Sequence, residues 1–139
     1  EECEIKPHVI QMEAHPYYRD EETISALAPC GCRVMAWYPL GHGDHALLEE
    51  PIVKELAEKY EKSTAQVILR WHTQVGNIVI PGSTNPEHIK ANLDIFGFEL
   101  TDEEMKKMEG LNKNVRYYYP DEEKLAAYVN MKIDLDSQK

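Results

Sequence analysis

Two short stretches decide the fold class: PHVIQME at residues 7–13 and RVMAWYP at residues 33–39. The first predicts a short strand, because apolar residues are followed by the alternation of Gln11, Met12 and Glu13. The second is almost continuously apolar, which is typical of a strand buried on both faces of a parallel sheet. Residues 20–28 between them predict a helix that begins with three acidic residues, a charge that favours a helix N-terminus. Strand, helix and strand in this order predict parallel pairing.

The alternation of helices and strands continues along the chain. Further helices are predicted at residues 51–60, 65–74, 86–92 and 101–110, and a third strand at residues 78–80. Their starts carry Pro51, the Ser63-Thr64 pair, Asn85 and Thr101, residue types that begin helices. Residues 111–139 read as a polar tail with one helical turn around residues 125–129. The fold class is therefore α/β, with three parallel strands whose outer edges lack a partner.

Composition excludes several classes of partner. The 139 residues include 15 Lys and Arg against 25 Asp and Glu, a formal net charge of −10, which disfavours nucleic acid and anionic membrane surfaces. No uncharged apolar stretch approaches the roughly 18 residues of a membrane span, and residues 1–4 do not resemble an export signal. The three cysteines include Cys30 and Cys32, which we expect in a helix-to-strand turn rather than a redox site, so a cytoplasmic protein is expected.

The sequence also contains residues that could form a metal site or a hydrolase site. His42 and His45, with Asp44 between them, could gather a divalent ion, but the surrounding glycines favour a mobile loop, and we weight the loop more heavily. Glu13 beside His15 could belong to a hydrolase with paired acidic groups. The acidic runs elsewhere stand at helix starts, where a structural role is sufficient.

The ends of the strands carry the residue types that a nucleotide needs. Gln11 follows the apolar residues of the first strand, Trp37 to Gly41 follow the second strand, and residues 81–88 follow the third. In barrels of alternating strands and helices, ligands bind at these ends. An amide can pair with a carboxamide, an indole can stack on a ring, and backbone N–H groups can hold a phosphate. A core Trp followed by two ordinary turns is an equally weighted alternative.

Six blocks of this sequence resemble the aldo-keto reductases. They are residues 9–17 (VIQMEAHPY), 36–41 (AWYPLG), 64–71 (TAQVILRW), 79–83 (VIPGS), 86–92 (PEHIKAN) and 98–105 (FELTDEEM), in family order and spacing. The resemblance implies a (β/α)8 TIM barrel that binds an extended nicotinamide dinucleotide and reduces aldehydes and ketones to alcohols. The three strands would be the sixth to eighth of that barrel, which makes this chain a partial, incomplete barrel over residues 1–116 with a tail over residues 117–139.

The same resemblance implies roles for individual residues. Gln11 would bond the nicotinamide carboxamide, Trp37 would stack on its ring, and Leu40 and Gly41 would fold over the pyrophosphate. The remaining cofactor residues would be Gly82, Ser83, Thr84, His88 and Asn92, near the adenosine. Gly82 and His88 stand where the family usually has a Lys and an Arg that meet the extra phosphate of NADPH. Losing both cations predicts that NADH is used comparably to NADPH or better.

The family's catalytic Asp, Tyr, Lys and His fall in none of the matched blocks, so no catalytic residue is predicted here. We expect the C-terminal portion of an NAD(P)H-dependent carbonyl reductase, inactive as a separate chain because nothing protonates the developing alkoxide. A small carbonyl compound would be the substrate of the full-length parent. The alternative is a non-catalytic remnant that binds a nucleotide or pairs with a second copy through its open sheet edges.

Overall fold

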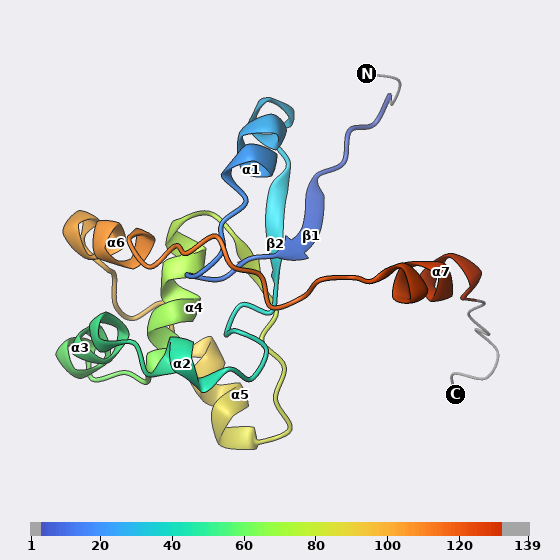
Figure 1. The fold of residues 1–139 in the computed structure, drawn as a ribbon. Coiled ribbons are helices and arrows are strands. Elements are labelled where there is room, and N and C mark those ends of the chain that lie inside the picture. Colours follow the sequence, from blue (N-terminus) through green and yellow to red (C-terminus); the bar gives the residue numbers. More distant parts are fainter. Residues whose placement is uncertain (1–3, 132–139) are drawn as a thin grey trace.

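A computed structural model of the chain describes residues 4–131. The elements, in chain order, are β1 (Val9–Glu13), α1 (Glu21–Leu27), a 3₁₀ turn η1 (Ala28–Cys30), β2 (Arg33–Trp37), α2 (His45–Leu48), α3 (Pro51–Tyr60), α4 (Thr64–Gln74), β3 (Ile78–Val79), α5 (Pro86–Leu93), α6 (Asp102–Glu109) and α7 (Glu122–Asn130). In Figure 1, helices α1 to α6 lie to one side of β1 and β2, whereas α7 lies on the other side at the end of an extended segment.

The three strands form one parallel sheet in the order β1-β2-β3, as the sequence predicted. Gln11 pairs with Met35 and Glu13 with Trp37 across β1 and β2, and Ala36 pairs with Val79 across β2 and β3. Within the described residues the sheet is not closed, so the outer sides of β1 and β3 lack a strand partner.

Helix starts follow the sequence closely because they depend on local hydrogen bonds. Ser63 caps α4 and Gln66 returns the bond to the backbone of Ser63, and Thr101 and Glu104 form the same reciprocal pair at α6. Asn85 accepts from the backbone N–H of Glu87 at the start of α5. Cys30 and Cys32 flank a left-handed Gly31 at the turn into β2, as expected, and both are free thiols.

Strand β2 is buried on one face only, so the prediction of burial on both faces was wrong. Val34 and Ala36 pack with Ala14 and with the helix residue Ile24, whereas Arg33 is exposed and Trp37 half-buried. Side chains alternate along a strand, so Arg33 and Trp37 share the face that no element covers within residues 4–131. Gln11 belongs to this uncovered face and lies inside β1, not after it.

Two further elements differ in extent from their prediction. The segment after β2, expected as a loop through His45, contains the short helix α2, which begins where the Asp44 carboxylate accepts from the N–H of Ala46. In the tail, the single expected turn is the longer helix α7, capped by Asp121. Both helices begin at an aspartate that accepts a backbone N–H, which a search for apolar periodicity does not detect.

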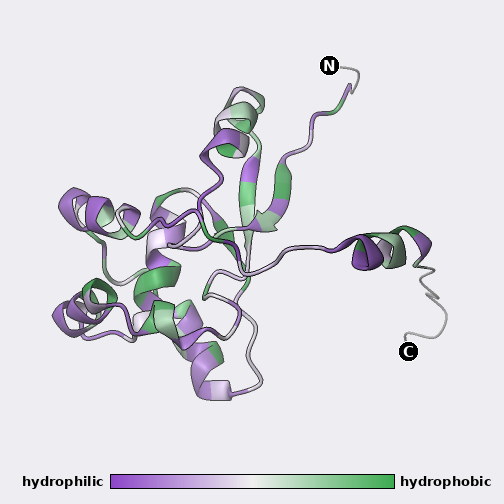
Figure 2. Ribbon diagram, viewed as in Figure 1, coloured by the Kyte–Doolittle hydropathy of each residue, from purple (hydrophilic) through white to green (hydrophobic). Residues whose placement is uncertain are grey.

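The larger hydrophobic core lies among the helices α3, α4 and α6 rather than on the sheet. Its buried members are Tyr17, Leu47, Val53, Leu56, Ala57, Val67, Ile68, Trp71, Leu100 and Met108. Figure 2 shows hydrophobic residues on β1, β2 and α4, with hydrophilic residues on the outer turns of the peripheral helices. The larger core is separate from the smaller cluster on the sheet, whose buried members are Ala14, Val34 and Ala36.

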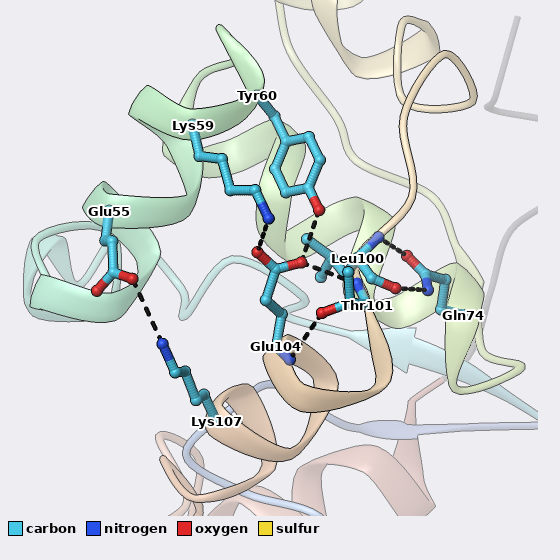
Figure 3. A network of polar contacts seen from close by, with 8 residues as sticks. All are labelled: Glu55, Lys59, Tyr60, Gln74, Leu100, Thr101, Glu104 and Lys107. Atoms are coloured by element: carbon cyan, nitrogen blue, oxygen red, sulfur yellow. Dashed lines mark hydrogen bonds and ion pairs between the residues drawn. The ribbon is translucent and has the colours of Figure 1, made fainter.

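A polar cluster joins the helices of this layer. The Glu104 carboxylate accepts hydrogen bonds from the Lys59 ammonium and the Tyr60 hydroxyl, both at 2.6 Å, and from the Thr101 N–H at 2.8 Å (Figure 3). Gln74 on α4 bonds both the N–H and the carbonyl of Leu100, at 2.8 and 2.9 Å. These bonds fix α6 against α3 and α4.

Candidate dinucleotide site

A cavity of about 350 Å³ lies at the carboxyl ends of β2 and β3. It is lined by Gln11, Ala36, Trp37, Tyr38, Pro39, Leu40, His42, Gly43, Ile80, Pro81 and Gly82. The volume is in the range of ordinary ligand pockets. Four residues singled out from the sequence therefore meet in one place: Gln11, Trp37, Leu40 and Gly82.

Three aromatic rings form a stack along this cavity. The ring centroids of Trp37 and Tyr38 are 4.0 Å apart with planes 21° apart, and those of Tyr38 and His42 are 3.8 Å and 28° apart. The ring of Tyr118 meets that of Trp37 edge-on at 5.1 Å. Trp37 thus has one face covered by Tyr38, and the ring of Tyr118 lies beside it at a steep angle.

Tyr38 and His42 are site residues that sequence reasoning missed. Both residues have left-handed backbone angles, with φ of 56° for Tyr38 and 53° for His42, which residues other than glycine rarely adopt. Such angles cost about 1–3 kcal/mol each and cluster at functional sites. The glycines at positions 41 and 43 were the available signal, since they show that the chain turns sharply after β2.

The loop Gly41–Asp44 closes one side of the cavity. Gly41 is buried with φ of 81°, and a Cβ there would lie 3.3 Å from Leu47 Cδ2 and from the Tyr117 ring. Asp44 caps α2 through Oδ1, and its Oδ2 accepts from the Tyr117 hydroxyl at 2.8 Å. Gly41 itself does not line the cavity, but Leu40 and Gly43 on either side do.

The opposite wall is the segment after β3, which separates the remaining predicted residues. Asn92 lines a second, more apolar cavity of about 300 Å³ between β3 and α5, and this cavity shares Ile80 and Pro81 with the first. Ser83 accepts from the N–H of Asn85 at 3.1 Å, which shapes the turn. Thr84 and His88 are exposed, and neither lines the two cavities.

Glu13 and His15 form a buried pair beside the site. The Glu13 carboxylate contacts His15 Nε2 at 3.0 Å and accepts the backbone N–H groups of Tyr117 at 2.5 Å and Tyr118 at 3.3 Å. Burial lowers the pKa of His15 and outweighs the opposing effect of Glu13. The carboxylate is 7% exposed and His15 is inaccessible, so this pair ties the tail to β1 and is not available for hydrolysis.

His72 on α4 contacts the segment that follows β2. Its Nε2–H donates to the Pro39 carbonyl at 3.2 Å, and its Nδ1 accepts from the Asn77 amide at 3.1 Å. Burial lowers its pKa to about 3. His72 is therefore neutral at physiological pH and fixes the position of Pro39, which lines the cavity.

Neither a metal site nor a membrane-spanning helix is found in the described part of the chain. Among residues 4–131, no group of three His, Cys, Asp or Glu side chains is arranged to hold a metal ion, and His42 and His45 are exposed on either side of the α2 cap. The helices within the same residues are too short or too polar for any of them to cross a membrane.

Comparisons with known proteins agree with this geometry. A model of the family described as Aldo/keto reductase family matches residues 1–113. Aldo-keto reductase family 1 member A1 of Sus scrofa is 44% identical over 124 residues, which cover 84% of this chain and 38% of the pig protein. The chain thus spans about two fifths of the length of the curated relatives it matches.

Two solved structures resemble the fold and contain a dinucleotide. A mutant of Gox0644 in complex with NADPH has a TM-score of 0.74 and 37% identity, covering 78% of this chain and 39% of its own. Bombyx mori aldo-keto reductase in complex with NADP has a TM-score of 0.75 and 35% identity, covering 83% and 40%.

Proposed function

This chain belongs to the aldo/keto reductase family, and we propose that it forms much of the nicotinamide dinucleotide site of a carbonyl reductase. Its open sheet of three parallel strands with flanking helices is part of a (β/α)8 barrel. The observation that carries the proposal is the meeting of Gln11, Trp37 and Leu40 around one cavity at the strand ends.

The residues present fit a nicotinamide dinucleotide. The Gln11 amide can both donate to and accept from a carboxamide. Tyr38 covers one face of Trp37, so a nicotinamide ring would stack on the other face. Leu40 and Gly41 would close over the pyrophosphate. Gly82, Ser83 and Thr84 would lie beside the ribose of the adenosine. Asn92, in the adjoining cavity, would meet the adenine.

The bound dinucleotide would supply a hydride to a carbonyl carbon. The family's proton-donating Tyr and its Asp, Lys and His partners correspond to none of the matched blocks. We therefore propose that this chain corresponds to the C-terminal portion of such an enzyme, and that by itself it binds the dinucleotide without reducing aldehydes. The substrate would be a small aldehyde or ketone.

Relaxed cofactor choice is a finer part of the proposal. Where the family has a Lys and an Arg, this chain has Gly82 and His88, and His88 is exposed on α5. Without those cations the extra phosphate of NADPH lacks charge-assisted hydrogen bonds. His88 can still stack on adenine or accept from a ribose hydroxyl. NADH should therefore bind comparably to NADPH or better.

Titration of the chain with NADPH and with NADH, followed by the fluorescence of the reduced nicotinamide, tests the proposal. We expect saturable binding, weakened about tenfold or more when Trp37→Ala removes the stacking surface. The matched control is Tyr119→Ala, which removes an aromatic ring that is 66% exposed and outside the cavity. His88→Arg should strengthen binding of NADPH but not of NADH. A hundredfold preference of the unaltered chain for NADPH would refute the relaxed choice.

Self-association is a second candidate function. Within the described residues the outer sides of β1 and β3 are unpaired, and Ile80, Leu93 and Phe96 near β3 are 64–72% exposed. Two copies could cover these surfaces by pairing their sheet edges. Sedimentation at several concentrations distinguishes the cases: a dimer mass that Leu93→Glu converts to a monomer supports association, whereas a monomer at all concentrations excludes it.

A further inference from the structure

The backbone and the ring of Tyr117 make contacts that are separate from the contact of its hydroxyl. Its N–H donates to the buried Glu13 carboxylate at 2.5 Å, and the centroid of its ring lies 4.6 Å from that of the His15 ring. The preceding residues Lys113 and Val115 donate their N–H groups to the Tyr17 carbonyl at 3.0 and 3.3 Å. These bonds attach the segment after α6 to the end of β1 and to the turn that follows it, so the backbone of Tyr117 is anchored.

From this anchored position the Tyr117 hydroxyl reaches the loop over the cavity. It donates to Asp44 Oδ2 at 2.8 Å, and its ring packs where a side chain on Gly41 would stand. The other hydrogen bonds of residues 41–44 are local, such as the bond of 2.9 Å from the Asp44 N–H to the Gly41 carbonyl. Within residues 4–131, the hydroxyl of Tyr117 provides the one hydrogen bond that ties this loop to a distant part of the chain.

The two oxygens of Asp44 have separate functions. Oδ1 accepts from the Ala46 N–H at 2.8 Å and caps α2, while Oδ2 accepts from Tyr117. These two bonds, the backbone one first, lower the pKa of Asp44. Burial, and next the bond to Asp44, raises the pKa of Tyr117, so its hydroxyl remains a donor at neutral pH. Asp44, the last residue of the loop, is thus bonded both to α2 and to the segment after α6.

We propose that Tyr117 is a positioning residue for the dinucleotide: its hydroxyl, through Asp44, holds the Gly41–Asp44 loop in the conformation that closes over the bound pyrophosphate. This inference rests on the proposed function, because Leu40, His42 and Gly43 of the same segment line the cavity assigned to the dinucleotide. The segment after α6, distant in sequence from the strand ends, would then set how long the cofactor stays bound.

Two substitutions remove the bond from either side. Tyr117→Phe removes the hydroxyl and keeps the ring against His15. Asp44→Ser keeps a side chain able to cap α2 but is too short to reach Tyr117. Tyr119→Phe, which removes a hydroxyl from an exposed ring outside the cavity, is the matched control. Two quantities are measured for each chain: hydrogen exchange of the amides of residues 41–48 without ligand, and the Kd for NADPH.

We expect Tyr117→Phe and Asp44→Ser each to speed exchange of the loop amides and to raise the Kd for NADPH about fivefold, the order expected for the net contribution of one typical hydrogen bond. The double variant should match either single variant, because both remove the same bond. Unchanged loop exchange in Tyr117→Phe, or faster exchange with an unchanged Kd, would overturn the inference and leave the proposed function standing. Failure of the unaltered chain to bind NADPH or NADH would overturn the proposed function and the inference with it.

Discussion

The Glu104 cluster gives the sharpest prediction for stability. Glu104→Gln removes one negative charge from a carboxylate that is 6% exposed and accepts bonds from Lys59, Tyr60 and Thr101. A Gln oxygen can still accept from the Thr101 N–H, so the helix cap is retained. The loss is therefore confined to the contacts with Lys59 and Tyr60. Since a hydrogen bond to a charged group contributes about 1.5–3 kcal/mol and Lys59 is half-exposed, we expect a loss of about 2 kcal/mol at pH 7.

The dependence on pH identifies the charge as the cause. Burial alone would raise the pKa of Glu104, but the bonds from Lys59, Tyr60 and Thr101 outweigh it and lower the pKa from 4.5 to about 2. A carboxylate with a depressed pKa stabilises the fold above its unfolded pKa, and this stability is lost as the pH falls through the folded value. The difference between wild type and Glu104→Gln should therefore shrink between pH 4.5 and pH 2.

Urea unfolding followed by tryptophan fluorescence measures this difference, since Trp71 is fully buried in the same core. Glu103→Gln is the matched control, because it makes the same change of charge at the exposed neighbouring position of α6 and should cost at most about 0.5 kcal/mol. A loss of stability in Glu104→Gln that is the same at pH 7 and pH 2.5, or one no larger than the control's, would refute the assignment.

Three other substitutions test the core, a cap and the loop, each by the change in the free energy of unfolding. Leu56→Ala should cost about 3 kcal/mol because it opens a cavity in the helical core, whereas Leu93→Ala, on an exposed side chain, should cost under about 0.5; equal losses would contradict the placement of the core. Ser63→Ala should cost about 1 kcal/mol through loss of the α4 cap, and Ser63→Asp should retain most of the stability. Gly41→Ala should destabilise more than Gly43→Ala: both have φ of 81°, but only the first would crowd Leu47 and Tyr117.

Much of the fold follows from local sequence. The caps at Ser63 and Thr101 were predictable because the bonds that begin those helices join residues three apart, and β1 and β2 were predictable from their apolar runs. The exposure of one face of β2 was not predictable, because apolar residues indicate burial only where another layer covers them. The four residues of α2 carry too little periodicity to be detected, although Asp44 supplies the cap.

The candidate site was predictable to a similar degree. Gln11, Trp37 and Gly82 meet because the carboxyl ends of parallel strands lie at one edge of a sheet. His88 lies on an exposed turn of α5, away from the first cavity, which spacing along the sequence does not reveal. The bond from Tyr117 to Glu13 joins residues 104 positions apart and could be found only in three dimensions.

The central claim is that the strand ends bind a nicotinamide dinucleotide, and mapping of backbone amide shifts during titration with NADH tests it most directly. We predict saturable shifts concentrated at Gln11, at residues 37–43 and at residues 82–84, with little change on α3 and α6. The absence of saturable shifts, or shifts centred on α3 and α6, would contradict the claim.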